Sequence, residues 1–255
     1  MSVLVLDFVP LVGCVLYALL VGLLTRRLVS HEWRERQNTM TGAVTATICT
    51  LLVLLLSFVI VTIWQSLSGA QATVAKEVDS LGTAYYAAQQ VDDQQARLRI
   101  EHQILDYADR VINVEWPLMA SHRSDATATG YVHDMRDEAY ALTPSTAQQQ
   151  LVQDHLVTHL ETLSEFRRDR ITAVSSQVPG VLWALLGIGA AGTIGLTALL
   201  GTPSGRMHMA LLLSTAVIVG FALTFVNDLS FPFDGLAKVT PTSFKVFLSR
   251  VDPPR

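Results

Sequence analysis

Two histidines near the middle of the chain have a spacing suited to metal binding. His155 and His159 are four residues apart, so a helix would place both imidazoles on one face. Two imidazoles are not a complete metal site, and neither Asp154 nor Glu161 completes a known ligand signature. The sequence also lacks an HExxH, P-loop, GxGxxG or GxSxG motif in the surroundings that such a motif requires. We therefore predict exposed histidines, no metal, no cofactor and no enzymatic activity.

Two carboxylates, Asp228 and Asp234, flank a Phe-Pro-Phe turn in the stretch "NDLSFPFDG". The turn follows the apolar run from Met207 to Val226, and a carboxylate inside hydrocarbon costs about 3 kcal/mol. We therefore expect these acids to mark the point where a membrane-crossing helix meets water and is ended by proline. The alternative is a polar ring or cation site at a pore mouth. The residues of the motif are Asn227, Asp228, Pro232, Phe233, Asp234 and Gly235.

Glu115, Trp116 and Pro117 form a second motif. Trp116 continues an apolar helical face and Pro117 ends or kinks the helix, which indicates a packed structural corner. Glu115 either pairs with an arginine such as Arg110 or Arg167, or lines a polar path. The sequence does not choose between these roles.

Four apolar stretches are long enough to cross the hydrocarbon layer, which takes about 20 residues of helix. They are Val3 to Leu24, Gly42 to Trp64, Val178 to Leu200 and Met207 to Val226. No basic residue precedes the first stretch and no Ala-x-Ala site follows it, so we expect a membrane helix and not a cleaved signal. Asp7 lies near its N-terminal edge, either at the interface or as a proton or ion site.

Small residues recur at every fourth position of the third stretch, at Gly187, Ala191 and Gly195. This spacing lets helices approach closely, and close packing is a main source of helix association in lipid. We predict a helix-packing face. A pore-lining helix hinged on glycine is the alternative.

The polar segment between the second and third stretches carries most of the charge of the chain. Its apolar residues recur at helical spacing, which predicts about four amphipathic helices. The first of them is expected to continue from the second span without a break. Breaks are expected at Trp116-Pro117, within Ser121 to Gly130 and at Thr143-Pro144. The apolar positions are Leu98, Leu105, Ala108, Ile112, Val152, Leu156, Leu160 and Leu163.

These patterns predict an all-α integral membrane protein with four transmembrane helices and an amphipathic helical bundle inserted between spans 2 and 3. Half of the residues are apolar and the formal net charge is only -4, so the lipid bilayer is the expected partner. No Lys/Arg-rich tract is present, which argues against nucleic acid. The expected organisation is spans 1 and 2 with a short basic loop (1–64), the polar insert (65–177), spans 3 and 4 (178–226) and an interfacial tail (227–255).

Arginine in the short loops predicts the orientation. The loops "TRRLVSHEWRER" and "GTPSGRMH" lie on one face of the membrane, and the positive-inside rule places that face in the cytoplasm. The insert and both termini are then extracytoplasmic. Arg167, Arg168 and Arg170, at the opposite end of the third span, weaken this prediction.

Four stretches of the sequence resemble a known family. "WQSLSGAQATVAKEVDSL", "YADRVINVEWPLMA", "FRRDRITAVSSQVPGVLWALL" and "NDLSFPFDGLAKVTPTSF" occur in this order. Together they resemble the bacterial bestrophin-like domain family, four-span membrane proteins whose activity is not established. The resemblance implies a multi-pass protein of the bacterial plasma membrane. The family's turn usually reads Asp-Arg-Pro-Phe-Ser-Gly, whereas this chain has Ser-Phe-Pro-Phe-Asp-Gly and lacks the basic residue.

Two functions follow as hypotheses. Bestrophins, to which this family is distantly akin, are pentameric anion channels whose pores can be lined by apolar side chains. The resemblance therefore implies a homo-oligomeric ion channel. The same comparison places the insert in the cytoplasm, which disagrees with the orientation predicted from the loop arginines. We retain the orientation that the loop arginines predict. The alternative is an accessory or interaction subunit of a larger membrane complex, whose helical insert binds a partner protein or ligand.

Overall fold

The computed structural model describes residues 8–121, 123–174, 178–202, 204–235 and 237–251, so Asp7 lies outside the described residues. Within these ranges all regular structure is helical and no strand is present, which confirms the predicted fold class. The chain divides into two compact units. We call Met1–Trp64 with Gln177–Ser230 the membrane unit, and Gln65–Ser176 with Phe231–Arg255 the insert unit.

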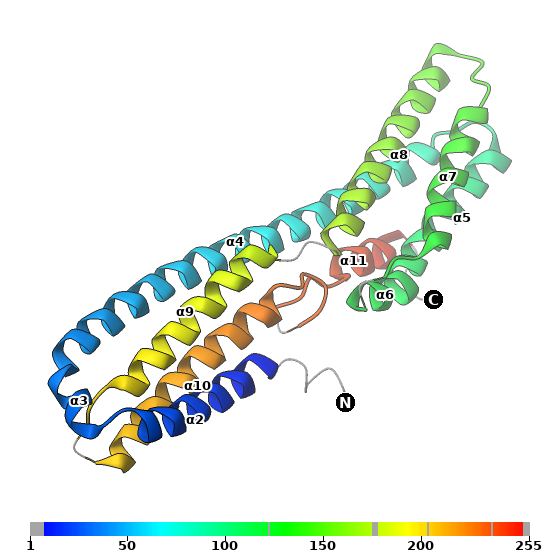
Figure 1. The fold of residues 1–255 in the computed structure, drawn as a ribbon. Coiled ribbons are helices and arrows are strands. Elements are labelled where there is room, and N and C mark those ends of the chain that lie inside the picture. Colours follow the sequence, from blue (N-terminus) through cyan, green and yellow to red (C-terminus); the bar gives the residue numbers. More distant parts are fainter. Residues whose placement is uncertain (1–7, 122, 175–177, 203, 236, 252–255) are drawn as a thin grey trace. The chain divides into compact units, whose positions relative to one another are not determined.

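Four helices are long and apolar enough to cross a membrane, as predicted. They are α2 (Val9–Leu28), α4 (Asn38–Ala88), α9 (Gly180–Leu199) and α10 (Gly205–Leu229), and the short α3 (His31–Arg36) lies between the first two (Figure 1). The predicted start of the first span at Val3 lies outside the described residues. Helix α2 has proline in its first turn, where a missing N–H is tolerated. Helix α4 continues past the span to Ala88, which confirms that the insert begins as an extension of span 2.

The core of the membrane unit joins all four spans through apolar side chains such as Ala18, Leu52, Ile194 and Leu212. Helices α2 and α10 pack closely at Gly220, because a Cβ added there would lie only 2.8 Å from the Leu11 Cα atom.

The predicted small-residue face of α9 has two different environments. The Tyr17 hydroxyl of α2 donates to the Ala191 carbonyl at 3.4 Å, and a Cβ on Gly195 would meet the same hydroxyl at 3.3 Å. A Cβ on Gly187 would meet nothing within 4 Å in this chain. A packing role for Gly187 therefore stays a prediction.

The insert unit contains the C-terminal part of α4 together with α5 (Gln94–Arg110), a π-helical turn η1 (Val111–Glu115), α6 (Trp116–Ala120), α7 (Ala126–Ala141), α8 (Ala147–Val174) and α11 (Thr242–Val251) (Figure 1). These helices bury one apolar core. The predicted α8 stripe is confirmed, because Val152, Leu156, Leu160 and Leu163 are all buried, whereas Leu98 of α5 is exposed.

The breaks in the insert follow proline and capping residues. Helix α7 ends at Ala141, just before Thr143-Pro144, as predicted. The predicted break from Ser121 to Gly130 is shorter, because the Asp125 side chain accepts the Thr127 N–H and starts α7 at Ala126. Helix does not end at Pro117 but continues through η1 into α6, with proline in the first turn of α6.

Candidate functional site

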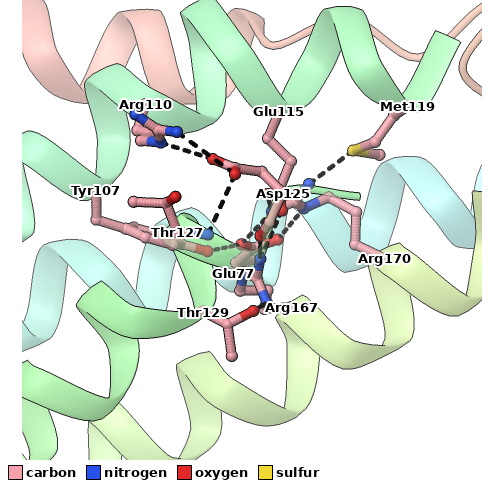
Figure 2. A network of polar contacts seen from close by, with 10 residues as sticks. All are labelled: Glu77, Tyr107, Arg110, Glu115, Met119, Asp125, Thr127, Thr129, Arg167 and Arg170. Carbon is pink, nitrogen blue, oxygen red and sulfur yellow. Dashed lines mark hydrogen bonds and ion pairs between the residues drawn. The ribbon is translucent and has the colours of Figure 1, made fainter. Parts of the chain in front are cut away.

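The most unusual feature of the insert unit is a fully buried arginine. Arg170 of α8 is 0% exposed, and its Nε donates to Glu77 Oε2 at 2.6 Å. Its Nη2 donates to Glu77 Oε1 at 3.0 Å and to Glu115 Oε2 at 2.8 Å (Figure 2). One guanidinium group therefore bridges two carboxylates, from α4 and from η1, neither of which is exposed.

A second arginine completes the pairing of Glu115. Arg167 Nη2 donates to Glu115 Oε1 at 2.5 Å and to the Asp125 carbonyl at 3.1 Å, while Nη1 donates to the Thr129 hydroxyl at 3.0 Å. Arg167 was one of two partners that the sequence suggested for Glu115. The two arginines and two glutamates balance in formal charge, which is the condition for keeping such groups out of water.

Tyr107 of α5 adds a neutral donor to the network. Its buried hydroxyl donates to Glu77 Oε1 at 2.5 Å. Burial raises the pKa of Tyr107 well above its usual value, and the nearby Glu77 charge raises it further, so the phenol stays protonated. Burial alone would lower the pKa of Arg170, but Glu77 and Tyr107 raise it well above the usual range. Arg170 is therefore a fixed cation and not an acid or a base.

Arg110, the other suggested partner of Glu115, pairs with Asp125 instead. Its Nε donates to Asp125 Oδ2 at 2.6 Å. This bond lowers the pKa of Asp125, against the opposing effect of burial, and the Thr127 N–H lowers it further. The Asp125 carboxylate thus caps α7 and ties that helix to α5, while its carbonyl accepts from Arg167 (Figure 2).

A π-helical turn positions Glu115 and Trp116. The Trp116 N–H donates to the Val111 carbonyl, five residues earlier, so this turn is wider than an α-helical one. Both of these neighbouring side chains are buried: Glu115 meets the two arginines, and the Trp116 Nε1 donates to the Val239 carbonyl at 3.3 Å. Arg170 lies over the Trp116 ring at 5.5 Å from the centroid. Glu115 and Trp116 are thus both packed inside the insert unit, and Glu115 is part of the ion network.

The C-terminal motif packs on Trp116. Phe233 is buried edge-to-face against Trp116, with ring centroids 5.7 Å apart, and the Phe244 ring also packs edge-to-face on Trp116 at 6.1 Å. The Pro232 carbonyl accepts the Val239 N–H at 2.8 Å, and Gly235 supplies the turn with a φ of 82°. Phe233 therefore packs in a protein core and not at a lipid interface.

The polar residues of the same motif lie in different units. Asn227 and Asp228 are half-buried in the last turns of α10, in the membrane unit. Asp234 belongs to the insert unit, and its N–H donates to the Phe231 carbonyl at 3.3 Å. A polar ring or cation site formed by these acids stays a prediction.

The two histidines of α8 face each other, as their spacing predicts. The Nε2 atoms of His155 and His159 lie 3.0 Å apart. Among the described residues, no group of three or more His, Cys, Asp or Glu side chains is placed to hold a metal ion.

The comparisons with known proteins agree with this architecture. A family model for the bestrophin-like domain matches residues 12–244. The chain belongs to the bestrophin-like domain family. No curated protein sequence matches it.

Two solved structures share the fold of this bestrophin-like chain. A bacterial bestrophin homologue from Klebsiella pneumoniae is 13% identical over 94% of this chain and 95% of that chain, with a TM-score of 0.58. A crystal structure of a membrane protein is 12% identical over 96% of this chain and 98% of that chain, with a TM-score of 0.59. At these identities the likeness shows the fold alone.

The sequence analysis did not identify three residues of the network: Glu77, Tyr107 and Asp125. The sequence points to the buried ion pair only when the patterns of α4 and α8 are compared. Arg167 and Arg170 continue the heptad spacing of Leu156, Leu160 and Leu163 on α8. On α4, Glu77 interrupts an apolar stripe with the same spacing, formed by Leu67, Ala70, Val74, Leu81, Ala84 and Ala88. Opposite charges within two apolar stripes indicate a buried pair.

Replacing Arg170 will strongly destabilise the insert unit. Arg170→Met leaves a buried carboxylate without its counter-ion, and we expect a loss of about 3–5 kcal/mol in unfolding free energy. Adding Glu77→Gln restores charge balance and should recover part of this loss. Arg168→Met, an exposed neighbour, should stay within about 0.5 kcal/mol of the wild type. Denaturant unfolding in detergent measures all three, and equal stability of Arg170→Met and Arg168→Met would contradict the network.

Asp125 should make stability depend on pH. The Asp125 pKa is lower in the folded state than in the unfolded state, where it is about 3.9. The ion pair with Arg110 therefore stabilises the folded state fully above the unfolded pKa. This stabilisation is lost as the pH falls through the folded pKa. Asp125→Asn keeps a capping side chain but loses the ion pair. Wild type and variant should differ most in melting temperature near pH 7 and converge in acid. A constant difference from pH 7 to pH 3 would show that the pair is not the cause.

Proposed function

We propose that this chain is the subunit of a homo-oligomeric ion channel of the bestrophin type, with a pore lined by apolar side chains. Its membership of the bestrophin-like family and its likeness in fold to a bacterial bestrophin homologue support this proposal. The observation that carries it lies on α4, which has an apolar face that is exposed among the described residues of the membrane unit.

That face is formed by Leu51, Leu54, Phe58 and Val61, which recur at heptad spacing and are each more than half exposed. We call them the α4 stripe. The opposite face of the same helix packs into the membrane unit through side chains such as Leu52. Heptad spacing is the pattern by which helices of neighbouring chains pack around a common axis.

Hydroxyl groups of α4 do not form a polar lining. Thr47, Thr50, Ser57 and Thr62 each donate to the carbonyl four residues earlier in their own helix. A pore along the α4 stripe would therefore be apolar, and an apolar constriction conducts or closes according to whether water fills it. Closed rotational symmetry is the usual arrangement of identical subunits and would bring one stripe from each copy to the axis.

Flux through purified protein tests the pore. In liposomes, the wild type should carry anion flux, and Leu54→Ser should raise its rate because a hydroxyl eases wetting of the constriction. Val12→Ser changes a comparably exposed side chain of α2 and serves as the matched control, with a rate close to that of the wild type. No flux at any voltage or pH, or equal effects of the two substitutions, would contradict the proposal.

Imaging of the purified particle separates the channel from the alternative function. A closed ring of identical chains with the α4 stripes around its axis supports the channel. A single copy bound to a stoichiometric foreign subunit would instead support the accessory role.

We further propose that the short loops face the cytoplasm and that the insert and both termini are extracytoplasmic. The four arginines of the first short loop and Arg206 of the second support this orientation, whereas Arg167, Arg168 and Arg170, which lie close to the start of α9, oppose it. In a cysteine-free background, an impermeant maleimide added to intact cells should label Ser145→Cys, in the α7–α8 loop, and not Glu32→Cys of α3. Labelling of Glu32→Cys and not of Ser145→Cys would show that the orientation is the opposite of the one proposed.

A further inference from the structure

The short-loop end of the membrane unit contains a buried arginine, Arg34, that forms no ion pair with any described residue. Arg34 of α3 is 9% exposed, and its Nε is buried without a hydrogen-bond partner among the described residues. None of the ion pairs found between described residues involves Arg34. A buried cation left in this state is costly, which distinguishes Arg34 from the paired arginines of the insert.

A histidine at the same end of the membrane unit also has a buried ring nitrogen without a hydrogen-bond partner among the described residues. His208, in the first turn of α10, is 3% exposed, and its Nε2 is also buried without a partner among the described residues. The guanidinium groups of Arg34 and Arg26 both act electrostatically on the His208 ring. These three side chains come from α2, α3 and α10, and the short-loop ends of these helices contact one another at Gly201 and Gly205.

Contacts between the short loops hold these groups in place. The Asn38 side chain exchanges two hydrogen bonds with the Gly201 backbone, each 3.2 Å long. A Cβ on Gly201 would lie 2.8 Å from the Glu35 nitrogen, so α3 packs directly on this loop. The Arg26 Nη2 donates to the Gly205 carbonyl at 2.5 Å, which ties α2 to the start of α10. The position of Arg34 is thus fixed by the backbone.

The surrounding charge favours an anion. Residues 25–38 and 200–208 contain five arginines and two glutamates, and one of the glutamates, Glu35, pairs with His31 at 3.5 Å. The N-terminus of α10, a helix of 25 residues capped by Ser204, adds the positive end of its dipole.

We propose that Arg34, His208 and Arg26 bind a phosphate group at the end of the membrane unit where spans meet the headgroup layer. Arginine is the side chain best matched to phosphate oxygens, and its donors remain available here. The phosphate belongs either to the headgroup of an anionic phospholipid or to free phosphate in solution. Both sources share the same chemistry, and the site is independent of whether the protein conducts ions.

Lipid binding to the detergent-purified full-length protein tests this proposal. Native mass spectrometry should show retained phosphatidylglycerol in preference to phosphatidylcholine. Because hydrogen bonds to charged groups are worth about 1.5–3 kcal/mol, Arg34→Gln should weaken the binding by about tenfold or more. Arg36→Gln removes the same charge from an exposed position on α3 and should bind within about twofold of the wild type.

Two further experiments complete the test. Competition with inorganic phosphate identifies the source of the phosphate, and a second variant keeps the test valid if the first does not fold. If inorganic phosphate competes with phosphatidylglycerol, free phosphate suffices; if it does not, the lipid headgroup is required, and either result supports the site. His208→Gln repeats the test should Arg34→Gln fail to fold. The proposal is overturned if the wild type shows neither lipid preference nor phosphate binding, or if Arg34→Gln and Arg36→Gln weaken the binding equally.

Discussion

The buried ion network of Glu77, Arg170, Glu115 and Arg167 is the interaction on which the insert unit depends. Each charge lies almost wholly out of water, so each must be paired and hydrogen-bonded to remain there. The groups come from α4, η1 and α8, and Tyr107 and Asp125 extend the network to α5 and α7. Hydrophobic burial alone would tolerate small shifts between such helices. The directional bonds of two guanidinium groups do not, so the network fixes the register of α4 against α8.

The network also explains why the C-terminal segment belongs to the insert unit. Arg170 lies over the rings of Trp116 and Phe244, and Trp116 in turn holds Phe233 and the Val239 carbonyl. The Glu-Trp-Pro and Pro-Phe-x-Gly motifs are far apart in the sequence, yet they form one corner. Within the described residues, contacts between the two motifs join distant segments of the chain.

Much of this architecture was predictable because hydrocarbon imposes length and composition on a helix. The four spans followed from apolar runs, and the extension of α4 followed from the absence of proline between Ser66 and Gln90. The sequence suggested Arg110 or Arg167 as an ion-pair partner of Glu115, beside a role in a polar path, and did not choose between them. The role of Arg170 was not predicted, since charged residues on amphipathic helices normally lie in solvent, and the π-turn at Val111–Glu115 leaves no local sequence signal. The packing of Phe233 on Trp116 was not predicted, because the two rings are distant in sequence.

A side-chain resolution structure of the full-length protein in lipid nanodiscs tests the central claim most directly. The account predicts that the Arg170 guanidinium lies between the carboxylates of Glu77 and Glu115, within hydrogen-bond distance of both, with Trp116 against its face. A map in which Arg170 points to solvent, or in which Glu77 and Glu115 are separated from it by water, would contradict the account.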